Sequence, residues 1–303
     1  NERYSAIVEI KNHEKEALNI PQTFIERRDS YLCLDEALNL SESIKYDEAI
    51  DALDNAIAIY PDNPDAYYYK ANILSTYKGE KSEAIQVYNE SLKFNGGNAQ
   101  AWTEMGYCYL LTGKINESFR AFDMALSINP KLAYAWTGKG LALQSRGMYF
   151  EALNAFDKSL EINRYLVDVL NCRGLCLEAN GNHDEALADF KESALKSQEI
   201  LEENPNLTWI WISNGMSLHR LSKFHEAIES YKNAQEINPF LADARVSEGH
   251  SHIRLSEYQA AMEDFNKAIT ISPQSVEALL GKAIVLGSLC NHSDSLKIID
   301  QAL

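Results

Sequence analysis

The sequence is short of positive charge, and this shortage excludes two classes of partner. Lys and Arg together number 28 against 44 Asp and Glu, which gives a formal net charge of −16 at pH 7. Proteins bind nucleic acid through a basic face, because each phosphate contact needs a cation. Anionic membrane surfaces likewise attract clusters of Lys and Arg. We therefore expect no nucleic-acid partner and no membrane partner, and we expect partners of basic character.

Long hydrophobic runs are missing, and cysteines are few. No apolar stretch approaches the roughly 20 residues that a membrane-spanning helix needs. The five cysteines are odd in number and fall inside expected helices, which argues against a disulfide framework and for a reducing compartment. No signal peptide is visible. These features predict a cytoplasmic protein. The chain starts at Asn1 rather than Met, so a fragment of a longer protein and a chain that has lost a leader are both open alternatives.

Motifs for catalysis and metal binding are also missing. No Gly-rich phosphate-binding loop follows an expected strand. His225-Glu226 begins a string like that of zinc proteases, but Glu229 stands where the second histidine is required. Cys172 and Cys176 are spaced for two metal ligands, whereas a site needs three or four. We predict no catalytic residues, no metal site and no cofactor, and hence a protein that is not an enzyme.

What the sequence does contain is a repeated unit, seen best in residues 98–130. Apolar and small residues fall at helical spacing, a break follows at Thr112-Gly113-Lys114, and the helical spacing then resumes until a proline. This pattern predicts two antiparallel helices joined by a tight turn, with Gly106 and Ser118 small where the two backbones come close. The residues that carry the pattern are Trp102, Met105, Gly106, Tyr109, Ser118, Phe122, Ala125 and Pro130.

The unit recurs at an interval of 34 residues. Trp102 and Gly106 reappear as Trp136 and Gly140. A 34-residue period with W-x2-L-G-x2-Y, then A-x3-F-x2-A, then Pro is typical of the tetratricopeptide repeat, and the chain resembles that family over roughly residues 30–303. The resemblance implies an all-α fold: a right-handed α-α superhelix, or tetratricopeptide solenoid, of about eight helix-turn-helix repeats.

The expected repeats divide most of the chain, and two of them are irregular. Residues 1–29 do not match the repeat and are expected to form an N-terminal helical cap or a degenerate repeat, with a helix starting near Gln22. An extra residue is expected in the turn at Lys78-Gly79-Glu80. One repeat closes seven residues late, at Pro205, which predicts a longer second helix. The expected repeats are 30–63, 64–98, 99–132, 133–166, 167–207, 208–241, 242–275 and 276–303.

The resemblance also implies a function. In this family the first helix of each repeat lines a concave groove, which holds an extended peptide or a partner helix. We therefore predict a protein–protein interaction scaffold that binds a protein or peptide ligand in that groove. The alternative is a regulatory or substrate-recruiting arm of a larger enzyme whose catalytic domain lies outside this chain. Self-association through the C-terminal repeat is also open, because the chain stops at Leu303 before its last helix should end.

Carrying the family's groove positions onto this sequence gives two predicted surfaces. The N-terminal half is aromatic and acidic, with 12 acidic and 5 basic residues between positions 31 and 100. The C-terminal half is cationic and suited to a carboxylate. The alternatives are that the tyrosines are core or exposed helix residues and that the arginines pair within the protein. The predicted groove residues are Tyr31, Tyr68, Asn72, Tyr107, Tyr134, Asn171, His219, Arg220, His250 and Arg254.

Overall fold

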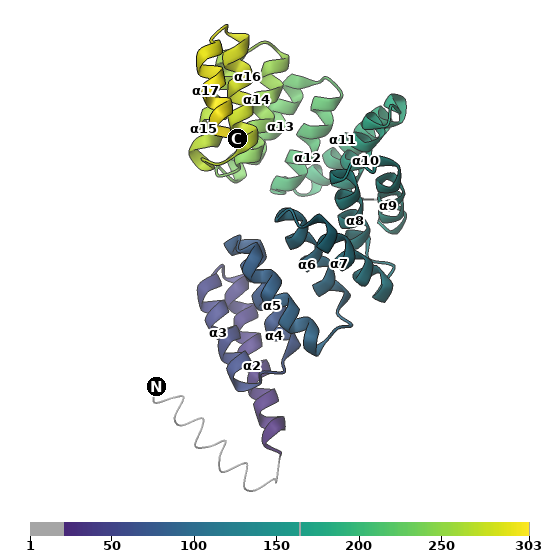
Figure 1. Ribbon diagram of the computed structural model, residues 1–303, viewed down its shortest axis with the longest axis vertical. Helices are drawn as coiled ribbons and strands as arrows, with labels where there is room; N and C mark the ends of the chain where they lie inside the picture. The colour runs from purple at the N-terminus through teal and green to yellow at the C-terminus, as the bar shows by residue number, and fades with distance from the viewer. Residues whose placement is uncertain (1–20, 164, 303) are drawn as a thin grey trace. The chain divides into compact units, whose positions relative to one another are not determined.

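The computed structural model describes residues 21–163 and 165–302, and this part of the chain is all α (Figure 1). It contains sixteen α-helices and one short π-helical turn, and no strand occurs in these ranges. The predicted all-α fold of helix-turn-helix repeats is thereby confirmed. The chain divides into two compact units, Asn1–Ala142 and Leu143–Leu303, and the division falls within helix α8.

The N-terminal unit is built from pairs of antiparallel helices. α2 packs against α3, α4 against α5 and α6 against α7, and α2 also contacts α4. α2 begins at Gln22 and continues into the first repeat; the rest of the expected cap, residues 1–20, lies outside the described residues. The elements are α2 (Gln22–Glu42), α3 (Tyr46–Ile59), α4 (Pro64–Ile73), η1 (Leu74–Lys78), α5 (Lys81–Phe94), α6 (Ala99–Leu111), α7 (Ile115–Ile128) and α8 (Ala133–Ser145), which runs across the division.

The C-terminal unit repeats this arrangement. Each first helix packs against its second helix, and the first helices α10, α12, α14 and α16 contact one another in sequence. They therefore form one face of this unit. None of the described helices in either unit combines the length and apolar character that crossing a bilayer requires. The elements are α9 (Tyr149–Ile162), α10 (Val167–Ala179), α11 (His183–Glu203), α12 (Thr208–Arg220), α13 (Phe224–Ile237), α14 (Ala242–Arg254), α15 (Tyr258–Ile271), α16 (Val276–Ser288) and α17 (His292–Ala302).

Four of the second helices, α7, α11, α13 and α15, pack an aromatic ring against glycines of first helices. Phe122 of α7 is fully buried, and a Cβ atom at Gly106 would lie 2.7 Å from its Cε1 atom, while one at Gly138 would lie 2.3 Å away. Glycine is needed here to admit a ring, whereas the sequence suggested close contact between two backbones. The same contact is made by Phe190 with Gly174, by Tyr231 with Gly215, and by Phe265 with Gly249 and Gly281.

The two irregular repeats show how the fold absorbs insertions. The extra residue of the second repeat forms a π-helical turn, Leu74–Lys78, and Gly79 follows with a φ of 72°. The insertion therefore lies mainly in the helix and not in the loop. The late-closing repeat has a second helix of 21 residues, α11, where α9 and α13 have 14. This confirms the predicted lengthening, and Leu201 near its end is buried against Ile210 of α12.

Ion pairs link neighbouring hairpins at an interval of 16 residues. A basic residue on a first helix pairs with an aspartate on the preceding second helix, as Lys70 does with Asp54 of α3. All three aspartates of these pairs are about half exposed, so each pair contributes up to about 1 kcal/mol. The other pairs of this kind are Lys139 with Asp123 and Arg173 with Asp157.

Candidate functional site

Four of the predicted groove residues come together in one pocket of the C-terminal unit. His219 and Arg220 end α12, and His250 and Arg254 occupy α14 one repeat later. They line a pocket of about 410 Å³ on the face formed by the first helices. We call it the cationic pocket. Its lining is completed by Met216, Tyr231, Ser247, Ile253 and Ile284.

The two arginines of the cationic pocket differ in their contacts. The Arg220 guanidinium lies 3.2 Å from a carboxylate oxygen of Glu178, and side-chain exposures of 44% and 31% make this a weak surface ion pair. The Arg254 guanidinium lies over the ring of Phe224, 4.9 Å from its centroid. Within residues 21–163 and 165–302 it has no carboxylate partner. Arg254 can therefore form a charge-assisted bond with an incoming carboxylate.

The two histidines of the cationic pocket are neutral at pH 7. Burial, with the positive charges of Arg220 and Arg254, lowers the pKa of His219 to about 4. Burial also lowers the pKa of His250, whose ring packs edge to face on Phe265. The positive charge of the pocket at neutral pH therefore comes from its arginines, while the imidazoles supply neutral hydrogen-bonding groups.

The buried His219 predicts a loss of stability in mild acid. Well above pH 6.5 its imidazole is neutral in both the folded and the unfolded chain. As the pH falls toward 4, the unfolded chain takes up a proton that the folded chain excludes. Because the ring is only partly buried and solvent screens part of the effect, the free energy of unfolding should fall by about 1–2 kcal/mol between pH 7 and pH 5 from this group alone.

Urea unfolding at a series of pH values measures this effect. His219→Asn is the comparison variant, because its amide can keep the 2.8 Å contact that His219 Nδ1 makes with Ser251 Oγ. The variant should lose less stability than the native protein over the same range. Parallel pH profiles for the two proteins would contradict the prediction.

The predicted tyrosines of the N-terminal unit lie on successive first helices and do not share one pocket. Tyr31 of α2 donates its hydroxyl to Asp65, at 3.0 Å, and Tyr107 of α6 donates to the backbone carbonyl of Tyr134, at 2.8 Å. These hydroxyls link neighbouring hairpins. Tyr134 itself is 60% exposed. A partner would therefore meet ring surfaces here more than hydroxyl groups.

Asn72 lies in a separate pocket of the N-terminal unit. The pocket has a volume of about 370 Å³, and we call it the aromatic pocket. The Asn72 side-chain oxygen accepts a 2.6 Å hydrogen bond from the Tyr88 hydroxyl, while Tyr68 packs edge to face on Tyr69 and does not line the pocket. Sequence reasoning missed Tyr69 and Tyr77. The pocket is lined by Ala37, Leu38, Ser41, Glu42, Leu53, Tyr69, Asn72, Ile73, Thr76, Tyr77 and Glu104.

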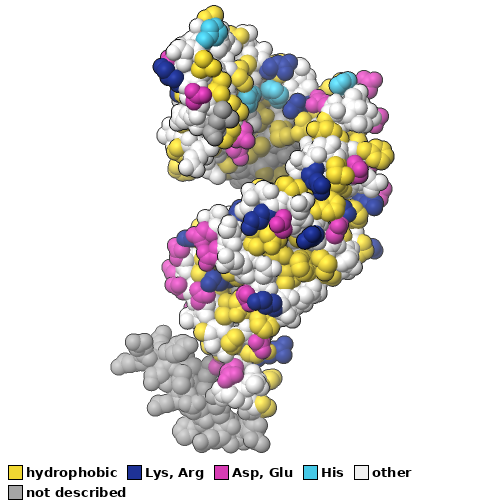
Figure 2. Space-filling view, in the orientation of Figure 1, with side chains coloured by type: hydrophobic (Ala, Val, Ile, Leu, Met, Phe, Trp, Pro, Cys, Tyr) yellow, Lys and Arg dark blue, Asp and Glu magenta, His cyan; other side chains and the backbone are white. Residues whose placement is uncertain are grey.

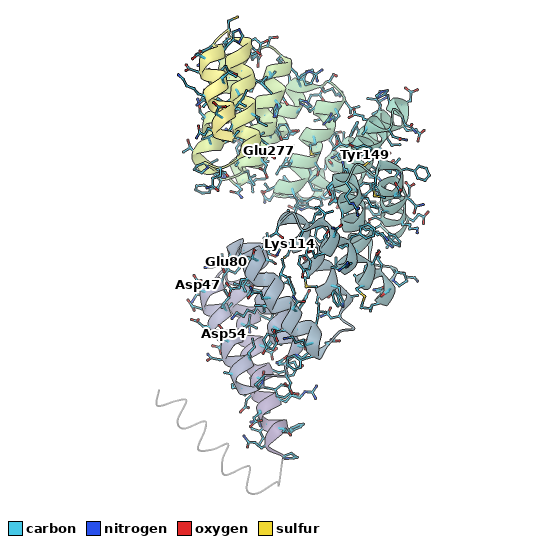
Figure 3. All side chains as sticks on the ribbon, in the orientation of Figure 1. Asp47, Asp54, Glu80, Lys114, Tyr149 and Glu277 are labelled. Carbon is cyan, nitrogen blue, oxygen red and sulfur yellow. The ribbon has the colours of Figure 1, made fainter. Side chains whose placement is uncertain are left out.

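Acidic side chains gather along one edge of the N-terminal unit (Figure 2). Asp47 and Asp54 project there from α3 (Figure 3). Lys78 lies 2.6 Å from a carboxylate oxygen of Asp47, yet the Asp47 side chain is 83% exposed. A basic segment of a partner could therefore reach this edge without displacing buried groups.

Asn171 does not belong to either surface. Its side chain is 1% exposed, its amide nitrogen donates to the Ser213 carbonyl at 3.0 Å, and its amide oxygen accepts from Ser217 at 2.7 Å. Small serines let α12 approach α10 closely, and this contact covers the position that the sequence placed in the groove. Asn171 therefore holds two first helices together.

Comparison with known families identifies the repeat. Residues 34–99 and 213–276 match a family model described as tetratricopeptide repeat, and residues 99–132 match a second model with the same description. Together these segments make up more than half of the chain. A search of curated proteins found no match.

Several solved structures have a similar fold and low sequence identity to this chain. A tetratricopeptide repeat protein from Parabacteroides merdae ATCC 43184 has a TM-score of 0.62 and 18% identity, covering 86% of this chain and 99% of its own. The APC/C hetero-tetramer Cut9-Hcn1 has a TM-score of 0.59 and 20% identity, and the match covers 90% of this chain and 55% of the other. MamA has a TM-score of 0.51 and 21% identity, and the match covers 55% of this chain and 96% of the MamA chain. At these identities the likeness concerns the fold alone.

Proposed function

Because the chain belongs to the tetratricopeptide repeat family, we propose that it is a non-enzymatic scaffold that binds a peptide or partner segment on the faces of its first helices. The cationic pocket takes a carboxylate of that partner. The observation that carries this proposal is Arg254, a cation at the pocket that has no carboxylate partner in the described part of the chain. A carboxylate entering there gains a charge-assisted hydrogen bond.

The aromatic pocket and the acidic edge suit a different part of a partner. Tyr69 and Tyr77 offer apolar ring surfaces, and Glu104 and the acidic edge add negative charge. Such a surface favours an apolar segment that carries Lys or Arg. We therefore propose a partner that combines an acidic residue or C-terminal carboxylate with a basic, apolar stretch.

Peptide display tests this proposal without a known partner. A random-peptide library with free C-terminal carboxylates is selected on the native protein, and the Kd of each selected peptide is measured by fluorescence anisotropy. For peptides that bind through an acidic residue or the C-terminal carboxylate, Arg254→Gln should raise the Kd roughly ten- to hundredfold. This is the effect of losing one hydrogen bond to a charged group. Arg146→Gln is the control, because Arg146 is exposed and does not line the pocket. Selected peptides that bind native protein and Arg254→Gln equally would refute the carboxylate site.

A further inference from the structure

The seventh hairpin, α14–α15, breaks the charge pattern of the fifth, α10–α11. In the fifth, Arg173 is the seventh residue of α10 and Asp189 the seventh of α11, and Arg173 donates two hydrogen bonds to Asp189, at 2.8 and 2.7 Å. In the seventh hairpin the same two places hold Glu248 and Asp264. Two buried carboxylates thus face each other where the fifth hairpin pairs a cation with a carboxylate.

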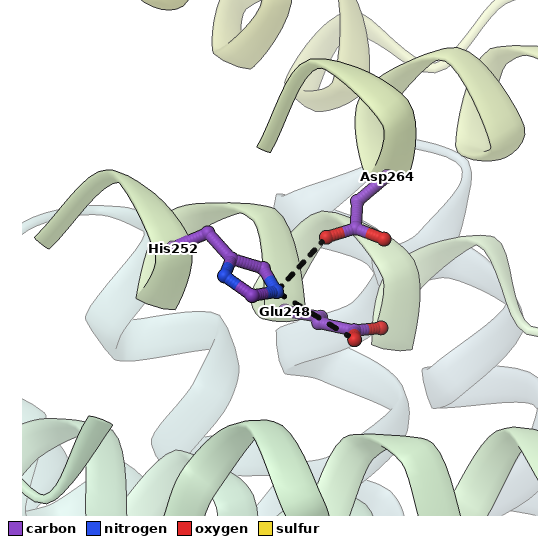
Figure 4. A group of neighbouring side chains, drawn as sticks. All are labelled: Glu248, His252 and Asp264. Carbon is purple, nitrogen blue, oxygen red and sulfur yellow. Dashed lines mark ion pairs between the residues drawn. The ribbon is translucent and has the colours of Figure 1, made fainter. Parts of the chain in front are cut away.

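A histidine completes a cluster with these carboxylates (Figure 4). His252 Nε2 lies 3.6 Å from Asp264 Oδ2 and 3.9 Å from Glu248 Oε1, and the three atoms all lie within 4.8 Å of one another. The side chains of Glu248, His252 and Asp264 are 2%, 12% and 8% exposed. Asp264 Oδ2 is buried and has no hydrogen-bond partner. It points into the cluster.

The contact that His252 Nδ1 makes with Glu257 determines that the lone pair of the neutral ring lies on Nε2. Nδ1 lies 2.6 Å from a carboxylate oxygen of Glu257, which can only accept when ionised, so Nδ1 carries the proton. In the neutral imidazole the Nε2 lone pair then faces Glu248 and Asp264. Three acceptor atoms that point at one another inside a protein are stable only when a proton or a metal cation lies between them.

The positively charged side chains near the cluster lie mainly beside Glu248 Oε2 and Asp264 Oδ1, the two oxygens that do not face His252. Arg245 lies 3.7 Å from Glu248 Oε2 and 3.9 Å from Asp264 Oδ1, and Gln235 donates to Glu248 Oε2 at 2.8 Å. Lys232 lies 3.9 Å from Glu248 Oε1, but its side chain is 59% exposed. Burial and the charge of Glu248 raise the pKa of Asp264 to about 7, consistent with incomplete neutralisation. Glu248 Oε1 and Asp264 Oδ2, the two oxygens that face His252, therefore still lack a close positive partner.

We propose that this cluster binds a divalent transition-metal ion of the Zn²⁺ class, with His252 Nε2, Glu248 Oε1 and Asp264 Oδ2 as ligands and water completing the coordination. Two ligands about 2.1 Å from a tetrahedral ion lie roughly 3.4 Å apart. The separations of 3.6 and 3.9 Å from His252 Nε2 are close to this value, and side-chain movement can bring the two carboxylate oxygens, which lie within 4.8 Å of each other, to it. Glu257 would hold the imidazole by its second nitrogen, as outer-sphere carboxylates do. The ion would tie α14 to α15 in place of the missing arginine.

The sequence predicted no metal site, because these three residues form no recognised ligand motif. Glu248 and His252 are one helical turn apart, and Asp264 comes from the next helix, so no familiar spacing joins the three. The repeat supplies the missing signal. A carboxylate at the place of Arg173 on a first helix, opposite an aspartate on the second helix, indicates a pair of like charges that another group must balance.

Cobalt titration of the full chain tests the site. Protein dialysed against chelator is titrated with Co²⁺, followed by visible absorption, and Zn²⁺ is then added in competition. We expect one tightly bound ion per chain and no thiolate charge-transfer band, a useful distinction because all five cysteines are free. Glu248→Gln, His252→Gln and Asp264→Asn should each weaken Co²⁺ binding at least about tenfold. His225→Gln, at an exposed histidine of α13, should not.

Thermal unfolding gives a second readout that does not depend on the spectrum. Zn²⁺ should raise the Tm of the native protein and leave that of Asp264→Asn unchanged, because only a bound ion stabilises the folded state. Circular dichroism establishes that each variant is folded. The site would be refuted by a native protein that binds no Co²⁺, by binding that survives His252→Gln, or by a thiolate band.

Discussion

Replacing Phe265 by alanine is expected to lower the free energy of unfolding by about 3–5 kcal/mol. The ring is fully buried between two helices that both present glycine to it: a Cβ atom at Gly249 would lie 2.9 Å from the ring, and one at Gly281 would lie 2.3 Å away. Because neither glycine has a side chain that could move into the cavity, the loss should lie toward the upper end of this range. Urea unfolding followed by circular dichroism measures it.

A matched phenylalanine serves as the control. Phe240 is 78% exposed in the turn before α14, so Phe240→Ala should change stability by no more than about 0.5 kcal/mol. In a repeat array the weakened hairpin can open before the others. Hydrogen exchange in Phe265→Ala should therefore accelerate first in α14, α15 and α16. Equal losses in the two variants would show that Phe265 is not a packing centre.

The sequence was sufficient to predict the hairpins, because a hairpin depends on local spacing. Helical periodicity, a turn and a proline recur at 34 residues, and the seven-residue insertion had to lengthen a helix to keep its apolar face in phase. Local spacing could not predict which group each small residue contacts. Gly106 recurs in the pattern whether it faces a backbone or the ring of Phe122, and only the packed structure distinguishes the two.

The cationic pocket was predictable for a related reason. Arg220 and Arg254 occupy the same place in successive repeats, so stacking of those repeats brings them to the same pocket. Asn171 was not predictable, because its burial depends on the serines of a neighbouring helix, α12. The aromatic pocket was not predictable either, because a π-helical turn, Leu74–Lys78, interrupts the regular helix that the repeat implies.

Replacing Arg173 by methionine is expected to cost about 3–5 kcal/mol of stability, because it leaves the buried carboxylate of Asp189 without its cation. The Asp189 side chain is only 7% exposed and accepts both hydrogen bonds of the guanidinium fork. Those hydrogen bonds raise the pKa of Arg173, as expected for a tightly held ion pair. Methionine keeps much of the volume of the arginine stem, so the loss should reflect charge more than packing. Chemical denaturation at pH 7 measures it.

Two further variants separate the buried charge from the exposed one. Asp157 accepts a 2.7 Å hydrogen bond from the same guanidinium but is 54% exposed, so Asp157→Ala should cost no more than about 1 kcal/mol. Adding Asp189→Leu to Arg173→Met should recover most of the loss, because no buried charge then remains. A double variant as unstable as Arg173→Met alone would show that the arginine stabilises the hairpin by its contacts and not by neutralising Asp189. That result would also weaken the case for a cation at Glu248 and Asp264, since the fifth hairpin is the pattern from which that cation was inferred.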